Sequence, residues 1–139
     1  MTTIADIMTR SVATVRRDET LQAAARRMAE MDVGSLPVLD GRAVTGMVTD
    51  RDIAVRGVAA GMIPQESLVA DVMTEQVRFC RAGDKVEQVM AEMGDLQVRR
   101  LPVLDADNEI VGIVALADIA TRQSTHTDET LREISTPGR

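Results

Sequence analysis

The chain has 139 residues, of which 45% are hydrophobic and 1% aromatic, and its formal net charge is −6. This is the length of one ordinary domain, and the hydrophobic content is enough to fill a core of that size. The negative charge argues against sequence-blind binding to nucleic acid. Phe79 is the sole aromatic residue, so the chain also lacks the stacking platforms on which proteins usually bind single-stranded nucleic acid.

The first residues and the single cysteine bear on the cellular compartment. The first ten residues lack a basic stretch followed by an apolar one, and no run approaches the roughly 18 apolar residues that a membrane span requires. We therefore expect a cytoplasmic protein without membrane contact. Cys80 is the only cysteine, so no intrachain disulfide is possible, and we expect a buried, apolar thiol.

The chain contains an internal repeat. The string ADIMT at 5–9 returns as ADVMT at 70–74, and LPVLD at 36–40 returns at 101–105, both 65 positions later. After this point the shift becomes 66, because the second copy's turn at 105–108 is one residue longer. Insertions are tolerated in turns, so the two copies align as structural repeats.

The first copy predicts a strand, a helix, a hairpin and a second helix. An apolar strand is expected over Val12–Val15, and the Asp-Gly turn at 40–41 predicts a hairpin between strands at 35–39 and 43–49. A second helix begins just after Thr49, and Asp18 is expected to cap the first. The first helix has apolar residues at helical spacing, and they are Leu21, Ala24, Ala25, Met28 and Met31.

The second copy repeats this order. A strand is expected over Val77–Cys80, strands at 101–104 and 109–114 form the hairpin, and a helix follows Ala115. Asp84 lies near the start of the first helix of this copy. The apolar face of that helix comprises Val86, Val89, Met90 and Met93.

We therefore predict an α+β fold built from two βαββα repeats. A sheet of three strands is too small to bury both faces alone, so the copies should pack with pseudo-twofold symmetry, sheets inside and helices outside. The predicted boundaries are 3–60 for the first repeat, 61–68 for a linker, 69–122 for the second repeat and 123–139 for a polar tail.

Residues that support catalysis are scarce. The only histidine, His126, lies in the polar tail, and the sequence contains no HExxH, CxxC, P-loop or GxGxxG string. Neither an activated nucleophile nor a set of metal ligands can be assembled, so we predict that the protein is not an enzyme, holds no metal and requires no cofactor.

The string at 49–52 has two interpretations. A threonine followed three positions later by an acidic residue, as in Thr49 and Asp52, is a capping box at the start of a helix. In the second copy Ala115 cannot cap, yet Asp118 is retained. Attraction to the helix dipole, worth roughly 0.3–1 kcal/mol, accounts for that carboxylate, and so does a role in binding a ligand.

Four motifs together resemble a known family. GMVTDRDI at 46–53 and GIVALADI at 112–119 close the two copies, and GSLPVLD at 34–40 and RRLPVLD at 99–105 lie in their middles. This pattern resembles a tandem pair of cystathionine-β-synthase-type (CBS) domains, a Bateman module, of the stand-alone bacterial type. The resemblance covers about residues 3–122. It implies binding of an adenosine-containing ligand such as AMP, ADP, ATP, NAD(H) or S-adenosylmethionine in a cleft between the repeats.

The resemblance also implies which residues form the first site. Asp52 would bond the ribose hydroxyls, Thr49 would assist at the ribose or phosphate, and Arg99 and Arg100 of the other copy would meet the phosphate. Arg51 is a weaker phosphate candidate, because a solvated helix residue explains it equally well. The adenine slot would be lined, chiefly through backbone groups and apolar contact, by Thr14, Val15, Val33 and Leu36.

The second site departs from the family pattern. Asp118 is present, but Ala115 and Ala117 replace polar residues, and Gly34 and Ser35 stand where the first site has two arginines. We expect it to bind phosphorylated ligands weakly or not at all.

The predicted function is therefore a regulatory adenosine-ligand sensor. It would work as a homodimer, with Met28, Met31, Met90 and Met93 as candidates for the contact face or, alternatively, for simple core packing. It would transmit a conformational change to an unidentified effector protein. The alternative is a ligand-independent interaction or stress-associated scaffold in which Thr49 and Asp52 only cap a helix.

Overall fold

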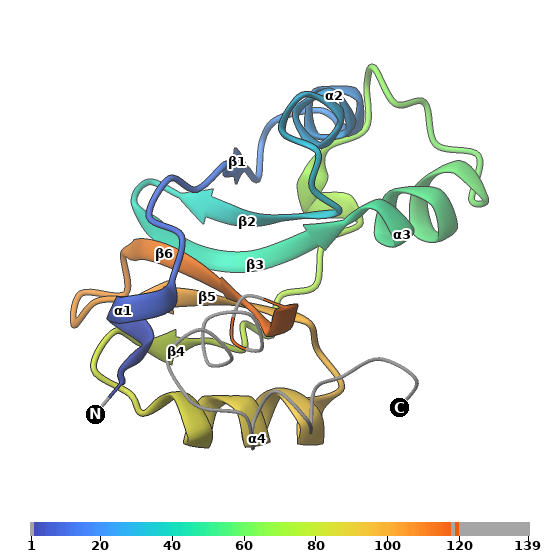
Figure 1. Ribbon diagram of the computed structural model, residues 1–139. Helices are drawn as coiled ribbons and strands as arrows, with labels where there is room; N and C mark the ends of the chain where they lie inside the picture. The colour runs from blue at the N-terminus through green and yellow to red at the C-terminus, as the bar shows by residue number, and fades with distance from the viewer. Residues whose placement is uncertain (1, 118, 120–139) are drawn as a thin grey trace, which may run out of the picture. The chain divides into compact units, whose positions relative to one another are not determined.

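The structure, a computed structural model, describes residues 2–117 and 119. It contains two three-stranded sheets, with strand orders β1-β2-β3 and β4-β5-β6, and several helices (Figure 1). The predicted α+β class is confirmed. The chain forms two compact units: the first-sheet unit comprises 12–78 and 106–110, and the second-sheet unit comprises the described residues up to Ser11, 79–105 and those from Val111 onward. The packing of the repeats against each other stays a prediction.

The first sheet has a parallel and an antiparallel pair. β1 (Val15–Arg16) runs parallel to β2 (Ser35–Asp40), which runs antiparallel to β3 (Ala43–Thr49). The predicted hairpin across the Asp-Gly turn is thus present, and Gly41 has the positive φ, 65°, that such a turn requires.

Two helical segments accompany this sheet. α2 (Leu21–Met31) lies over one face (Figure 1) and buries Leu21, Ala24 and Met28 in the core of the unit. After β3 the chain enters α3 (Asp50–Asp52) and continues without a break as a π-helix, η1 (Ile53–Val58). None of the described helices is both long enough and apolar enough to cross a bilayer.

The second-sheet unit repeats this arrangement. β4 (Cys80–Arg81) pairs in parallel with β5 (Arg100–Leu104), and β6 (Ile110–Ala115) completes the sheet. α4 (Val86–Leu96) buries Val86, Val89 and Met93. The short helix α1 (Ile4–Ile7) contributes both of its terminal isoleucines to the same core.

The first strand of each repeat is shorter than predicted. Val12–Val15 and Val77–Cys80 have the apolar pattern of strands. In β1, however, only Val15 and Arg16 pair with β2, and in β4 only Cys80 and Arg81 pair with β5. The preceding residues have no ladder partner, and a turn toward the helix follows directly after the two paired residues. Apolar character was therefore a poor guide to where the strands begin.

The predicted caps are also displaced. α2 begins after Thr20, whose hydroxyl accepts from Ala23 N at 3.1 Å, whereas Asp18 lies 3.5 Å from the Arg16 guanidinium. The N-cap of α4 is Lys85, and the Asp84 carboxylate accepts from the backbone of Arg81 at 2.9 Å. Both helices start later than the aspartates because a turn separates strand from helix.

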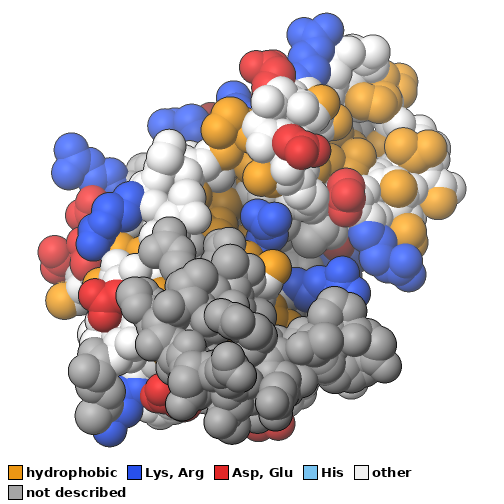
Figure 2. Space-filling view, in the orientation of Figure 1, with side chains coloured by type: hydrophobic (Ala, Val, Ile, Leu, Met, Phe, Trp, Pro, Cys, Tyr) orange, Lys and Arg blue, Asp and Glu red, His pale blue; other side chains and the backbone are white. Residues whose placement is uncertain are grey.

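The methionines proposed for a dimer face lie mostly in the cores. Met28 is 6% exposed and Met93 is fully buried, Met90 packs against the second core, and only Met31 is exposed. Ala25, expected on the apolar face of α2, is exposed as well. Exposed apolar side chains occur instead along η1 and the segment after it (Figure 2), and they are Val55, Val58 and Ile63. The homodimer itself stays a prediction.

The repeated ADIMT and ADVMT strings have matching structural roles in the two units. Thr9 pairs with Ile113 in the second-sheet unit, and Thr74 pairs with Met47 in the first-sheet unit. Met8 and Met73, which precede these threonines, enter the respective cores. Each string therefore packs beside the sheet of the other repeat, a feature that alignment of the repeats does not indicate.

A glycine permits each of these close contacts. A Cβ on Gly46 would lie 2.6 Å from the backbone oxygen of Thr74, and one on Gly112 would lie 2.7 Å from the sulfur of Met8. Because atoms of the sheet and of the added segment almost touch at these points, no side chain fits between them.

A half-buried ion pair joins α2 to the entrance of β1. Arg27 donates to both carboxylate oxygens of Glu19, at 3.0 and 2.9 Å, and to the carbonyl oxygen of Thr14 at 2.8 Å. Glu19 also accepts from the backbone N of Arg16 at 2.7 Å. The hydrogen bond from Arg27 is the main reason why the pKa of Glu19 lies below its ordinary value.

We predict that Gly46→Ala lowers the free energy of unfolding by roughly 1–3 kcal/mol, because the Cβ must displace backbone rather than a flexible side chain. Urea denaturation measures this change. Gly94→Ala is the matched control: it lies within α4 with nothing near its Cβ, and should raise the free energy of unfolding by about 0.5–1 kcal/mol. Equal effects of the two substitutions would contradict the close-contact explanation.

The Glu19–Arg27 pair should make stability depend on pH. The pKa of Glu19 is lowered in the folded protein, so the pair stabilises fully above the unfolded-state pKa, and this contribution disappears as pH falls through the folded-state pKa. Glu19→Gln should cost roughly 1 kcal/mol at neutral pH and progressively less in acid. Denaturation across a pH series tests this, with exposed Glu75 changed to Gln as the control. A constant difference at every pH would refute it.

Candidate functional site

Three chain segments meet at one edge of the first sheet. β1 is parallel to β2, so Thr14, just before β1, lies toward the edge where β2 begins. β3 is antiparallel to β2, and its last residue, Thr49, pairs with Ser35, the first residue of β2. The register therefore brings Thr14, Ser35 and Thr49 to the same edge, where helix α3 also starts.

The capping box predicted at this edge is complete. The Thr49 hydroxyl accepts from Asp52 N at 3.0 Å, and Oδ2 of Asp52 accepts from Thr49 N, also at 3.0 Å. Both side chains are half-buried. Within the described part of the chain, Oδ1 of Asp52 has no hydrogen-bond partner, so this carboxylate retains an acceptor after it has capped the helix.

Asp50 connects the end of β3 to the loop before β2. Its backbone N donates to the carbonyl of Gly34 at 2.9 Å, and its Oδ1 accepts from Arg51 N at 2.8 Å. A Cβ on Gly34 would lie 3.2 Å from Oδ2 of Asp50. The glycine therefore lets the carboxylate of Asp50 lie directly against the backbone beside the capping box.

The four residues expected to line the adenine slot differ in accessibility. Val15 and Leu36 are core residues, 1% and 0% exposed, so they offer a ligand backbone atoms rather than side chains. Val33 packs against the same core, and its backbone N donates to the carbonyl of Met28 at 3.0 Å. Thr14 is half-buried, and its carbonyl accepts from Arg27.

The arginines expected at the phosphate are exposed. Arg51 lies on α3, close to Asp52 in sequence. Arg99 and Arg100 belong to the second-sheet unit, where Arg100 opens β5 and the carbonyl of Arg99 accepts from Leu116 at 2.8 Å. Their participation with Asp52 in one site stays a prediction. Asp118 and His126 lie outside the described residues.

The described residues offer neither a cluster suited to a metal ion nor an exposed thiol. Among residues 2–117 and 119, no cluster of three or more His, Cys, Asp or Glu side chains is arranged to hold a metal ion. The expectation of a buried thiol is confirmed: Cys80 is 2% exposed, and burial raises its pKa to about 12.

Three residues of this region escaped sequence reasoning. Asp50 was passed over because the capping-box pattern concerns only Thr49 and Asp52, and Glu19 and Arg27 are eight positions apart, outside the i, i+4 spacing of helical ion pairs. One signal was available in the repeat. Glu19 aligns with Asp84, but Arg27 aligns with Glu92, so only the first repeat can form this pair.

Comparison with protein families identifies the repeats. The model of the CBS domain matches residues 4–57 and again 69–124. Hypoxic response protein 1 of Mycobacterium tuberculosis is 39% identical over 127 residues, which cover 91% of this chain and 88% of that protein.

Solved structures show the same fold. A signal-transduction protein with CBS domains from Burkholderia ambifaria, described as putative, has a TM-score of 0.81 at 29% identity and covers 91% of this chain and 97% of its own. Hypoxic Response Protein I, solved with two coordinated zinc ions, has a TM-score of 0.79 at 40% identity, covering 86% and 98%.

Two more distant structures hold adenosine compounds. The CBS domain pair of protein MJ0100, in complex with 5′-methylthioadenosine and S-adenosyl-L-methionine, has a TM-score of 0.80 at 23% identity, covering 91% and 99%. CBSX2, from Arabidopsis thaliana, in complex with AMP, has a TM-score of 0.77 at 24% identity, covering 91% and 98%. With two family matches that span most of its length, the chain belongs to the CBS domain family.

Proposed function

We propose that this protein is a regulatory module that binds an adenosine-containing ligand at the edge formed by Thr14, Gly34 and Asp52. The ligand would be held by its ribose, and its binding would change the arrangement of the repeats and thereby act on a separate effector protein. Such a ligand can act only if its affinity differs between two arrangements of the protein.

The main support is the carboxylate of Asp52. One of its oxygens caps α3, and the other has no partner within the described chain. Vicinal ribose hydroxyls are donors that a carboxylate binds well, and each charge-assisted bond contributes roughly 1.5–3 kcal/mol. Asp52 can therefore accept from a ribose without uncapping its helix.

The related structures support the same class of ligand. The complexes with AMP, S-adenosyl-L-methionine and 5′-methylthioadenosine share only the adenosine group. In the present chain the candidate residues at the sheet edge would contact that shared group, whereas Arg51, Arg99 and Arg100 would contact a phosphate. Guanidinium groups suit phosphate oxygens because they donate in a planar fork.

A specific observation also favours the scaffold alternative. Thr49 and Asp52 satisfy each other in a complete capping box, so their presence is explained by helix stability alone. In a scaffold, the free oxygen of Asp52 would contact only solvent, and the module would act through its surface without binding adenosine compounds.

Thermal melting separates the two functions. With AMP, ATP, NADH or S-adenosylmethionine at a hundredfold excess over its dissociation constant, a bound ligand should stabilise the fold by about 2.7 kcal/mol. For a protein of this size the melting temperature then rises by several degrees. If none of the four compounds shifts the melting temperature, the scaffold function is favoured and the sensor function is wrong.

Asp52→Asn distinguishes capping from ligand binding. The asparagine keeps an acceptor for Thr49 N but loses the charge and one acceptor oxygen, so the protein should remain folded and lose its ligand-induced shift. Asp6 caps α1 by the equivalent bond, which it accepts from Thr3 N at 2.9 Å, and it is the control: Asp6→Asn should leave the ligand shift unchanged. We also expect Asp118→Asn to change the ligand-induced shift in melting temperature little. If the substitutions at positions 52 and 118 reduced that shift equally, the prediction that the two sites bind unequally would be refuted.

The double variant Arg99→Gln, Arg100→Gln tests the phosphate contact. Removing both charges should weaken binding of AMP at least about tenfold, since a charged hydrogen bond contributes roughly 1.5–3 kcal/mol. Binding of uncharged adenosine should be unchanged, which isothermal titration calorimetry can compare directly. A similar loss for adenosine and AMP would show that the arginines support the fold rather than contact phosphate.

A further inference from the structure

The Arg27–Glu19 pair binds the backbone on both sides of Val15. Arg27 donates to the carbonyl of Thr14 at 2.8 Å, and Glu19 accepts from the N of Arg16 at 2.7 Å. The two side chains are joined by two parallel hydrogen bonds, 3.0 and 2.9 Å long. This paired, planar contact specifies direction as well as distance. The segment 14–16 is therefore held at two points, by Arg27 on helix α2 and by Glu19 just before that helix.

Little else holds this segment at its N-terminal end. β1 consists of two residues, and its ladder with β2 begins only at Val15. Residues 11–14 have no regular secondary structure. Although Ala13 packs against the core, apolar packing does not orient a carbonyl group as a hydrogen bond does. The orientation of the Thr14 carbonyl therefore depends on Arg27.

The second repeat lacks an ion pair equivalent to Arg27–Glu19. Asp84 accepts from Arg81 N at 2.9 Å, as Glu19 does from Arg16 N. The position of Arg27 is occupied by Glu92, however, whose side chain has no N–H group to donate and carries the same charge as Asp84. The pair is thus confined to the repeat that holds both Thr49 and Asp52.

We infer that Arg27 and Glu19 are positioning residues that set the preference of the adenosine site for its base, an inference that rests on the proposed function. Backbone groups discriminate between bases only when held within about 0.5 Å of the required place. Adenine presents an amino donor where hypoxanthine presents a carbonyl acceptor, so a rigid backbone edge that suits one opposes the other. A loosened segment would adapt to both.

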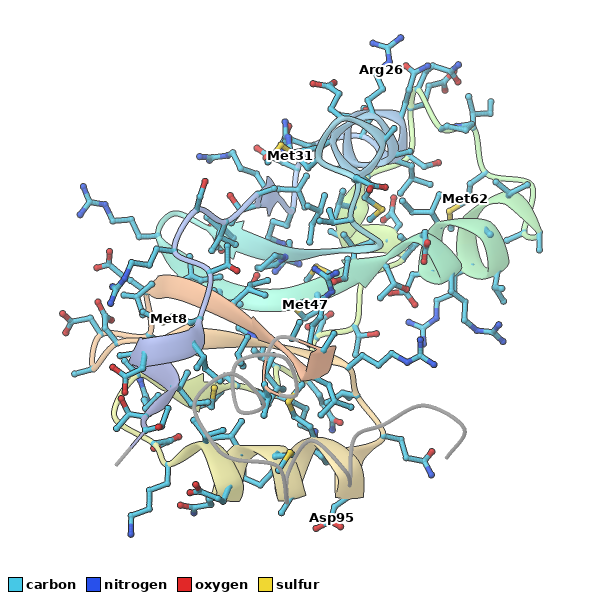
Figure 3. All side chains as sticks on the ribbon, viewed as in Figure 1. Met8, Arg26, Met31, Met47, Met62 and Asp95 are labelled. Atoms are coloured by element: carbon cyan, nitrogen blue, oxygen red, sulfur yellow. The ribbon has the colours of Figure 1, made fainter. Side chains whose placement is uncertain are left out.

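The test compares adenosine with inosine, which share the ribose and differ at the base edge. Arg27→Gln and Glu19→Gln should each lower the ratio of adenosine to inosine affinity about tenfold, the effect of about one hydrogen bond. The control is Arg26→Gln, because Arg26 is exposed on the same helix and points away from the sheet (Figure 3). It should leave the ratio unchanged. Calorimetric titration of the full chain measures both affinities.

The outcomes separate this inference from the proposed function. If the unaltered chain binds neither nucleoside, the proposed function fails and the inference fails with it. Suppose that the unaltered chain binds adenosine. If both variants then keep the same ratio of adenosine to inosine affinity, or lose affinity for the two nucleosides equally, only the positioning role is overturned. Glu19→Gln keeps the Arg27 side chain but removes the carboxylate charge that directs it, so it provides a second, milder variant should Arg27→Gln prove unstable.

Discussion

Each unit has a close contact between a glycine of its sheet and the backbone or methionine of a short added segment. Gly46 lies against Thr74 and Met73, and Gly112 lies against Thr9 and Met8. A three-stranded sheet has too little area to bury its own apolar face. Segments from outside the strand-helix-hairpin order close both cores, and only a residue without a side chain lets them approach.

The topology of the first sheet gathers the residues of the proposed ligand site at one end. One end of the first sheet is occupied by the turn at Gly41, and the opposite end collects the entrance of β1, the loop at Gly34 and the start of α3. Core residues such as Val15 and Leu36 hold these strands in place, and the hydrogen bonds of Arg27, Glu19 and the capping box orient the polar groups at this end before any ligand arrives. Pre-organisation of this kind lowers the entropic cost of binding.

Local patterns in the sequence predicted local structure well. The first hairpin followed from the Asp-Gly turn at 40–41 and the second from the repeat, the helices followed from apolar spacing, and the capping box followed from Thr49 and Asp52. The helix starts were missed locally, since the caps are Thr20 and Lys85 rather than Asp18 and Asp84, and the other main misses depend on distant contacts. The placement of Thr9 and Thr74, and the bonds from Arg27 to Glu19 and Thr14, depend on tertiary packing that no window of neighbouring residues contains. The membership of all the candidate residues in a ligand site stays a prediction, including that of Arg99, Arg100 and Asp118.

Helix capping and the proposed ligand binding are compatible roles for the carboxylate of Asp52. Capping requires one oxygen of Asp52, directed at Thr49 N. The second oxygen is not needed by the helix, and in water it would bond solvent. Replacing that water with ribose hydroxyls exchanges one set of hydrogen bonds for another, at little cost to the helix. In the second repeat, Ala115 stands at the position of Thr49 and has no hydroxyl. An aspartate there would therefore lack the partner that orients it.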